Sequence, residues 1–382
     1  MTICELHMTD KKNNYQHMKT IVIAHNYSEI SFAAMSYHFA HYIAGEGYRV
    51  VFISHKPYFF EQQLIESDGG EVIVCSWPTQ NRPTSIKDFI WFIKVYLKYK
   101  PSIVIGHFVG SNIPILVSKL LLFRKAKTFE YYHTLSSQIL IDLQKNSLKQ
   151  KFLFIRKRMF YALFCDTIIC PSELARMDLE KFYSFNKGVV LLNPMIDRFK
   201  NKFIISKEKI ILSFLGRLDA SKGVIDLIEA FELYKNNNQS SKIILNIAGS
   251  GKQSDKIFEM TKNNSSIHYM GQLEYEKVDE YLNKSHFTII PSKFDNLPTV
   301  GLESLMNMTP LLISTATGLA DYLEEGVDCF KFNPNINSII MVFQKLEINF
   351  NLYEKMSINA RTTFLNQFTI SNYCKDLKQI IE

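Results

Sequence analysis

The sequence lacks several features that mark familiar protein classes. No apolar run among its 382 residues approaches the roughly 18–20 residues that a membrane-spanning helix needs. Residues 1–19 are polar and mixed in charge, without the apolar core of a signal peptide, so we expect a loose tail and no export. The six cysteines lack the spacing of metal ligands or of a redox pair. Reduced thiols in a cytoplasmic protein are therefore expected.

The composition is that of an ordinary globular protein, with 47% hydrophobic and 21% charged residues. A chain of this length favours two domains. The net charge of +7 is distributed unevenly. Residues 1–195 carry 23 basic against 15 acidic side chains, whereas the remainder carries 21 against 22. This difference suggests different partners for the two halves.

Short apolar runs alternate with helical patterns along the whole chain, which indicates parallel sheets covered on both faces. The helical patterns include residues 31–44 and 86–99, the second ending before Pro101. The expected strands are 20–24, 49–53, 71–75, 102–105, 127–132, 167–170 and 188–192, then 210–215, 242–247, 267–270, 287–290, 310–313 and 329–332.

A polar segment with several cations, residues 191–203, separates the two series of strands. We therefore predict an α/β protein with two doubly wound domains, residues 20–195 and 196–365, which face a central cleft. A C-terminal helix over 366–382 could cross back to the first domain. Ligands of such sheets bind beyond the carboxyl ends of the strands.

The segment 214–231 suggests a site for a diphosphate. An apolar strand ends at Gly216, Arg217 and Lys222 follow five positions apart, and an amphipathic helix comes next. A helix N-terminus offers free N–H groups and a positive dipole, to which the two side chains add full charges. Taken alone, the same pattern also fits an ordinary strand–turn–helix with a surface arginine and lysine.

Two further elements follow in the second half. Gly249 and Gly251 close a strand, where they either let the backbone approach a ligand or form a simple tight turn. Asp295 and Glu303 stand eight positions apart, on either side of 297–299. Pro298 suits the first turn of a helix, which places Glu303 one turn in. Asp295 by itself would be read as a loop or capping residue.

The ordered set of strand-Gly-Arg-x4-Lys-Gly, Gly-x-Gly and PS-x2-Asp-x7-Glu resembles the C-terminal half of the family-four retaining glycosyltransferases. The resemblance is strongest over residues 207–335 and continues more weakly through CPSELARMDLEKF and LLNPMIDRF. It implies the GT-B fold. It also implies an enzyme that moves a sugar, of hexosyltransferase type, from a nucleotide-diphosphate sugar.

The resemblance implies roles for individual residues. Arg217 and Lys222 would bind the donor diphosphate and neutralise charge on the leaving group. Glu303 would hold the ribose, and Asp295 would approach the donor sugar ring. The other donor-binding residues would be Gly216, Gly249, Gly251, Asn296, Leu297, Pro298 and Thr299.

The sequence departs from the family pattern at several positions. Aspartate at 295 replaces the first glutamate of the family's Glu-x7-Glu pair, and Thr309 stands where glycine is usual. In the linker, NPMID replaces NGID. These changes bear on the donor sugar and the local turn geometry more than on the reaction.

The first half is more divergent. The family's glycine-rich loop is replaced by HNYSEISFAA, residues 25–34, so acceptor contacts are not carried over from it. His107 and His133 each follow an expected strand. By resemblance, His133 points at the reacting sugar and His107 lines the cleft on the acceptor side. Read alone, each histidine is an ordinary hydrogen-bonded loop residue.

The chemistry implied by the resemblance asks little of side chains. Fixed positive charge at the departing diphosphate is the largest expected contribution. Because no Asp-x-Asp signature stands in the expected setting, we predict no metal ion and no cofactor. The family retains the anomeric configuration, which implies attack on the face that the diphosphate leaves.

The main basic segment is residues 145–165. At helical spacing, Leu148, Phe152, Ile155, Met159 and Leu163 form an apolar stripe that we assign to the core, and Leu153, Phe160 and Phe164 form a second stripe beside Lys149, Arg156 and Lys157. Such a helix could rest on an anionic membrane, together with residues 119–127. It could equally be a packed helix with snorkelling cations.

The leading hypothesis is a retaining glycosyltransferase in surface polysaccharide or glycolipid synthesis. Its acceptor would be a glycan or a lipid-linked molecule at the inner face of the plasma membrane. Nucleic acid is disfavoured because no binding module is recognisable. Two alternatives remain open: a nucleotide-sugar epimerase of the same architecture, and a non-catalytic relative that only binds a partner.

Overall fold

The computed structural model describes residues 18–25, 30–55, 64–67, 69–80, 82–108, 112–121, 126–143 and 148–382. The predicted tail, but for its last two residues, lies outside this description. So does the middle of the HNYSEISFAA segment, residues 26–29.

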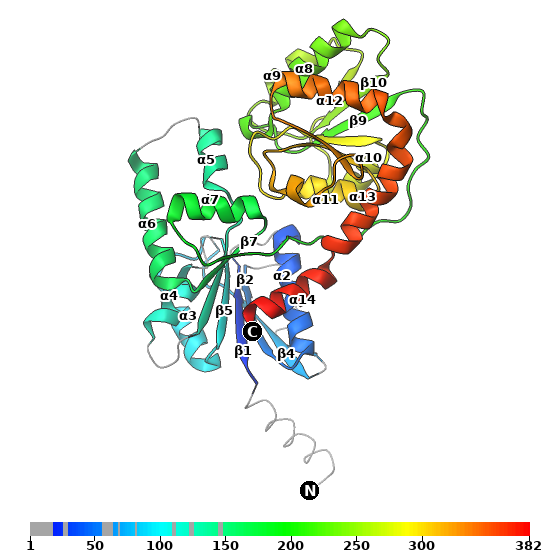
Figure 1. The fold of residues 1–382 in the computed structure, drawn as a ribbon. Coiled ribbons are helices and arrows are strands. Elements are labelled where there is room, and N and C mark those ends of the chain that lie inside the picture. The colour runs from blue at the N-terminus through cyan, green and yellow to red at the C-terminus, as the bar shows by residue number, and fades with distance from the viewer. Residues whose placement is uncertain are drawn as a thin grey trace, which may run out of the picture.

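The chain forms two α/β lobes, which stand one above the other in Figure 1. The sheet of the first lobe has the order β3-β4-β2-β1-β5-β6-β7-β8, and it is parallel except for β3. Its strands are β1 (Thr20–Ala24), β2 (Arg49–Ser54), β3 (Leu64–Ser67), β4 (Gly70–Ser76), β5 (Ile103–His107), β6 (Lys127–Tyr131), β7 (Thr167–Cys170) and β8 (Gly188–Val190).

Helices cover both faces of this sheet because successive side chains of the buried strands point to opposite sides. Val22 and Ala24 of β1 pack on the side of α3, α4, α6 and α7, whereas Ile21 and Ile23 pack on the side of α2. The helices are α2 (Ile30–Gly45), α3 (Ile86–Tyr99), α4 (Asn112–Leu120), α5 (Ser136–Leu143), α6 (Leu148–Phe164) and α7 (Glu173–Tyr183).

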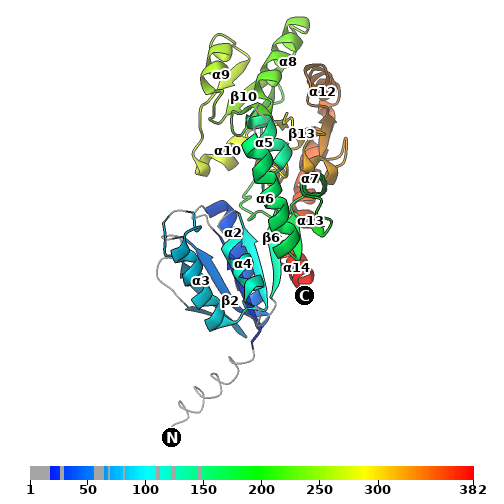
Figure 2. The same ribbon diagram turned by 90° about the vertical axis from the view of Figure 1, so that its left-hand side faces the viewer.

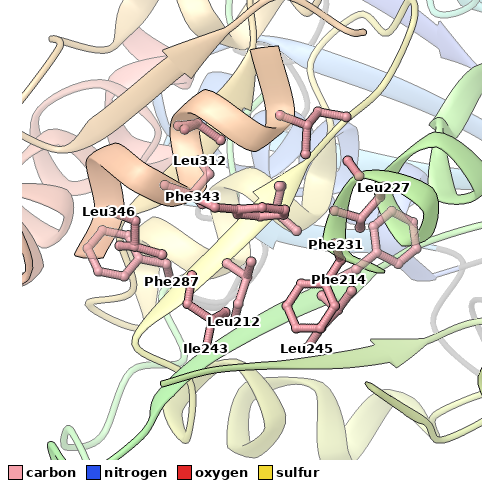
Figure 3. Packing of buried hydrophobic residues seen from close by; sticks show 14 of the residues in the cluster. Leu212, Phe214, Leu227, Phe231, Ile243, Leu245, Phe287, Leu312, Phe343 and Leu346 are labelled. Carbon is pink, nitrogen blue, oxygen red and sulfur yellow. The ribbon is translucent and has the colours of Figure 1, made fainter. Parts of the chain in front are cut away.

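The second lobe has a fully parallel six-stranded sheet of order β11-β10-β9-β12-β13-β14. Its strands are β9 (Ile210–Leu215), β10 (Ile243–Ala248), β11 (Ile267–Tyr269), β12 (Phe287–Ile290), β13 (Leu311–Ser314) and β14 (Cys329–Phe332). Figure 3 shows its core, in which Leu212 and Phe287 of the sheet meet Phe231 of α8 and Phe343 of α12.

The helices of the second lobe are α8 (Val224–Asn237), α9 (Ser254–Thr261), α10 (Val278–Asn283), α11 (Thr299–Met306), α12 (Ile336–Ile348) and α13 (Tyr353–Gln367). Short 3-10 turns are η2 (Ala220–Lys222), η3 (Tyr275–Lys277), η4 (Gly318–Tyr322) and η5 (Phe350–Leu352).

The last helix, α14 (Ile370–Ile381), leaves the second lobe and packs on the first, beside α2 (Figure 1). Tyr373 and Leu377 are buried in the core of the first lobe, where the Tyr373 hydroxyl lies 2.5 Å from that of Tyr131. The backbone thus passes between the lobes twice. The two passages lie side by side, because the Met195 N–H donates to the Phe368 carbonyl at 2.8 Å and Met195 pairs with Thr369.

The thirteen predicted strands form within two residues of their expected bounds. The sequence analysis missed β3, a short strand that pairs antiparallel with β4 at the edge of the sheet. Its sequence, LIES, has two apolar residues followed by two polar ones, so it shows neither a continuous apolar run nor an alternation.

The assignment of one apolar stripe of α6 to the core was wrong. Leu148, Phe152 and Met159 are among the exposed apolar side chains of the protein. Tyr161 is the fully buried residue of this helix, and Phe154, Phe160 and Phe164 pack partly against the core. Lys157 also points inward, with its ammonium 5.0–5.2 Å from the ring centres of Tyr132, Tyr161 and Tyr183.

Candidate active site

The predicted site residues follow strands at the point where each sheet reverses its order. β1 pairs with β2 on one side and β5 on the other, and β9 pairs likewise with β10 and β12. At such a reversal the connections diverge to opposite faces and leave a crevice beyond the carboxyl ends of the strands. The first lobe places histidines 25, 107 and 133 there, and the second lobe places its glycine loops and Asp295.

The two glycine loops of the second lobe pack backbone against backbone. A Cβ atom on Gly249 would lie 1.8 Å from the carbonyl oxygen of Gly216, so only glycine fits. Gly251 lies similarly close to the backbone of Leu218, whose N–H donates to the Ser250 carbonyl at 2.9 Å. The loops after β9 and β10 therefore form one unit with exposed backbone edges.

Lys222 meets Asp295 directly, although 73 residues separate them. Its ammonium donates to Oδ2 of Asp295 at 2.5 Å, and both side chains are largely buried. Gly223 makes the approach possible, because a Cβ there would lie 2.2 Å from the Pro291 carbonyl oxygen. The Lys293 N–H donates to the Ser221 carbonyl at 2.7 Å and fixes the two loops together.

Arg217 is the more accessible of the two predicted cations, with 60% of its side chain exposed. Its Nη1 lies 2.7 Å from Oδ2 of Asp219. Each cation therefore has a carboxylate partner within its own lobe. An anionic ligand that bound here would compete with these carboxylates.

Asn296 joins the two lobes. Its Oδ1 accepts from the Ser172 hydroxyl at 2.6 Å, and its Nδ2 donates to the His133 carbonyl at 3.4 Å. Pro298 is the N-cap of α11, one position before the predicted first turn, and Thr299 begins the helix. Leu297 is buried beneath this segment. The N-terminus of α11 thus lies beside the junction of the lobes.

Glu303 is buried one turn into α11, next to a cluster that the sequence analysis missed. Its Oε1 lies 3.5 Å from Nη2 of Arg198, which itself forms a bidentate pair with Asp279 at 2.9 and 3.0 Å. The guanidinium also lies over the ring of Tyr275, 5.1 Å from its centre. Burial raises the pKa of Glu303 to about 7, against the opposing effect of Arg198.

The histidines of the first lobe form a stack. Nε2 of His133 lies 3.1 Å from Nδ1 of His107, whose Nε2 lies 3.1 Å from the Ser36 hydroxyl. Loss of solvation lowers the pKa of His133 to about 3, so its imidazole is neutral at physiological pH. The same cause lowers the pKa of His107. These rings can orient hydroxyl groups but carry no positive charge.

Two family models together match most of the chain. Glycosyltransferase Family 4 matches residues 33–198, and Glycosyl transferases group 1 matches residues 195–363. The chain belongs to the group 1 glycosyltransferases. The two matches meet at the linker between the lobes.

Individual proteins agree with this family. An uncharacterized glycosyltransferase of Methanocaldococcus jannaschii is 27% identical over 198 residues, which cover 50% of this chain and 52% of that protein. The alpha-monoglucosyldiacylglycerol synthase of Acholeplasma laidlawii is 22% identical over 197 residues, or 50% of this chain and 48% of the relative. The alignments thus span about half the length of these relatives.

The fold itself matches solved structures over nearly the whole chain. An Anabaena protein, HepE, solved in complex with UDP, superposes with a TM-score of 0.69 at 10% identity, covering 95% of this chain and 99% of that one. At this identity the likeness shows the fold alone. It confirms the predicted GT-B architecture of two parallel-sheet domains.

In this group 1 glycosyltransferase the folding brings most of the predicted residues together. Lys222, Asp295 and Asn296 lie in contact or adjacent, and Asn296 reaches the backbone of His133. His107 is only 1% exposed and lies behind His133, so it does not line the cleft directly.

The sequence analysis missed Arg198, Tyr275, Asp279 and Ser172. Arg198 stands in LLNPMIDRF, which was treated as a linker with a run of cations. The bidentate partner of Arg198 is 81 residues further along the chain. No spacing rule predicts the pairing of Arg198 with Asp279, because the tertiary fold alone brings the linker to α10.

Proposed function

We propose that this group 1 glycosyltransferase transfers a sugar, with retention of anomeric configuration, from a nucleotide-diphosphate sugar to a glycan or a lipid-linked acceptor. The product would belong to a surface polysaccharide or a glycolipid. The transfer would need no metal ion and no cofactor. The reaction would take place in the cytoplasm.

The observation that carries the proposal is the junction around Asp295 and Asn296. Asp295 and Asn296 stand just before the N-terminus of α11. The largely buried ammonium of Lys222 contacts the Asp295 carboxylate, and the Asn296 amide links the two lobes. A sugar held by these groups would have a diphosphate beside Lys222 and Arg217. It would also have the neutral ring of His133 on its other side.

The two cations would supply the main catalytic contribution. As the bond to the diphosphate breaks, negative charge grows on the leaving phosphate, and fixed positive groups stabilise that charge. Arg217 offers a planar fork and Lys222 a compact charge. Binding of the donor would draw them from Asp219 and Asp295. Once Lys222 has left it, the Asp295 carboxylate could accept hydrogen bonds from hydroxyl groups of the donor sugar.

The cluster around Glu303 would hold the nucleoside. An ionised carboxylate accepts hydrogen bonds from ribose hydroxyls, and the Tyr275 ring beside Arg198 offers an apolar face. That HepE was solved with UDP supports a nucleoside diphosphate as ligand of this fold. The name of the Acholeplasma relative, a monoglucosyldiacylglycerol synthase, supports a lipid acceptor.

Release of nucleoside diphosphate from candidate donors tests the proposal. Replacing Lys222 or Arg217 with alanine should lower kcat by about 10²–10³-fold, because each change removes a charge from the leaving group. Lys293→Ala is the matched control, because the side chain of this nearby lysine pairs with Asp226 at 2.7 Å, while its backbone N–H, which joins the two loops, is kept in the variant. Activity that survived in both variants, with the control unchanged, would refute the assignment.

The same assay distinguishes a transferase from the two alternatives, an epimerase and a non-catalytic binder. An epimerase would convert the donor when no acceptor is present, which NMR of the products detects. A non-catalytic binder would be stabilised by nucleoside diphosphates without turnover. Turnover that is unchanged in the presence of a metal chelator would support metal independence. Turnover that the chelator abolished would contradict it.

A further inference from the structure

Helix α6 presents an apolar stripe to solvent, on the side opposite to its packed face. At 100° per residue, the side chains of Leu148, Phe152, Ile155, Met159 and Leu163 fall within one narrow sector. Their exposed fractions are 84%, 67%, 57%, 58% and 66%. Scattered exposed apolar residues are common, but five along one line of a helix form a continuous surface.

Basic side chains border this stripe on both sides. Lys149 and Arg156 lie along one edge, and Lys151 and Arg158 lie along the other; all four are exposed. The sequence of the helix, LKQKFLFIRKRMFYALF, contains no aspartate or glutamate. A stripe of apolar side chains between two rows of cations is the pattern of a helix that lies in a membrane interface.

Helix α3 lies beyond α4 on the same side of the molecule, and it also exposes apolar residues with a row of lysines along one edge. Ile86, Ile90 and Leu97 of α3 are 78%, 51% and 55% exposed. Lys87, Lys94 and Lys98 of this helix are exposed as well, whereas its one acidic residue, Asp88, is buried. Figure 2 shows α3, α4 and α6 on the side of the molecule that faces the viewer.

We propose that this face, formed by α6 and α3, docks the protein on an anionic lipid bilayer. The stripe on α6 extends over about 22 Å, enough to lie along a surface. In the described part of the chain no helix is long and apolar enough to cross a bilayer. The apolar residues would enter the boundary between headgroups and acyl chains, while the cations contact anionic headgroups.

A second copy of the chain fits this face less well. If two copies packed stripe against stripe, the rows of lysine and arginine would face like charges across the interface, which is unfavourable. Anionic headgroups instead complement every one of the exposed cations named above. The charge pattern therefore favours the bilayer over a dimer.

The docking face bears on the acceptor. If the proposed transfer is right, and only then, docking would hold the cleft near the bilayer surface, where a lipid-linked acceptor carries its reacting group. The docking surface itself does not depend on the reaction. The Lys222→Ala variant should therefore bind vesicles as the unmodified protein does, whatever its activity.

Co-sedimentation of the full chain with vesicles tests the proposal. The protein should bind vesicles of phosphatidylglycerol and phosphatidylcholine at least about tenfold more strongly than vesicles of phosphatidylcholine alone, and salt should weaken the binding. Replacing Phe152, Ile155 and Met159 together with serine should reduce binding at least about tenfold. A variant that combines Lys149→Gln, Lys151→Gln, Arg156→Gln and Arg158→Gln should lose the preference for anionic vesicles.

The matched control replaces two exposed apolar residues of the second lobe, Met341 and Ile348, with serine. It should bind as the unmodified protein does. Circular dichroism checks that each variant is folded, and the glutamine variant keeps the test valid if the serine variant is not. Failure of the unmodified protein to bind anionic vesicles would overturn the proposal. A dimer in solution that the serine variant disperses would assign the face to a second copy instead.

Discussion

Glu303 is the carboxylate at the site whose chemistry the fold changes most clearly. Burial disfavours its ionised form, and the nearby guanidinium of Arg198 offsets this only in part, because it is shared with Asp279. At neutral pH the group is therefore divided between two protonation states. If Glu303 accepts hydrogen bonds from ribose hydroxyls, nucleotide binding would depend on pH in the range where enzymes are usually assayed.

We expect nucleoside diphosphate to bind more tightly as the pH rises through about 7, where Glu303 ionises. The folded protein holds this proton more firmly than the unfolded chain does, because the ordinary pKa of a glutamate is 4.5. The contribution of Glu303 to stability should therefore decline as the pH rises from about 4.5 through about 7. Calorimetric titration and denaturant unfolding at several pH values measure the two effects.

The Glu303→Gln variant is the control for both measurements, because its amide does not titrate. It should flatten the pH dependence of nucleotide binding and should lack the decline in stability. If the variant kept the slope of the unmodified protein, the titrating group would lie elsewhere.

The sequence was informative where spacing along the chain reflects geometry. Arg217, Lys222, Asp295 and Glu303 stand at strand ends and helix starts, where local rules apply, and these rules predict their positions from the sequence alone. Arg198 and Tyr275 were not predicted, because their proximity to Glu303 comes from the path of the linker over the folded lobe. Asn296 was predicted as a donor contact, but its contacts with Ser172 and His133 depend on how the lobes meet.

At the scale of elements, the loops after β9 and β10 behave as one unit because their backbones touch. Contact at Gly249 leaves no room for a side chain, and its φ of 137° is unfavourable for one. The pairing of Gly216 with Ala248, at 3.2 Å, extends the contact between β9 and β10 beyond the sheet. The position of Arg217 therefore depends on a loop more than thirty residues away.

We expect Gly249→Ala to lower the free energy of unfolding by more than Gly326→Ala does. Both glycines have positive φ, which alone costs about 1–2 kcal/mol for alanine. Only at Gly249 must the neighbouring backbone also move. Denaturant unfolding gives the difference, and donor turnover should fall in the Gly249 variant alone. Equal effects at the two positions would show that contact with Gly216 is unimportant.

Helix α6 shows what periodicity leaves undetermined. Its pattern correctly predicted a helix, but two apolar stripes offered two candidate buried faces. The choice was settled by Lys157, whose ammonium lies among three tyrosine rings of the first lobe. A lysine is normally placed at the surface, so the sequence favoured the wrong stripe. The three tyrosines stand just after β6, in α7 and in α6 itself, and only the tertiary fold brings them together.

At the scale of the whole molecule, the order of the chain and the division into lobes do not coincide. The C-terminal helix completes the core of the first lobe, where Leu377 is 1% exposed and Cys374 is 2% exposed. Lys127 donates to the backbone carbonyl of Glu382 at 3.0 Å, which fastens the end of the chain. The stability of the first lobe therefore depends on α14, which follows the second lobe in the sequence.

Leu377→Ala should destabilise the first lobe by about 2–5 kcal/mol, because it leaves a cavity in a packed core. Hydrogen exchange should quicken in β1 and β6, far from Leu377 in sequence. Leu365→Ala is the control, since this residue of α13 is 44% exposed and should cost little. Faster exchange confined to the second lobe would contradict the role given to α14.

The paired passage of the backbone at Met195 and Thr369 constrains how the protein can move. Because both connections run through one narrow point, the lobes can swing about it as about a pivot while α14 stays seated. Across the crevice, such a swing must break the hydrogen bonds of Asn296 to Ser172 and His133, and that of the Glu173 N–H to the Tyr322 hydroxyl. It must also withdraw Phe294 of the second lobe, which packs against the core of the first. If the proposed transfer is right, each turnover would require this set of contacts to part and form again, so that a large donor could enter and its spent nucleotide could leave.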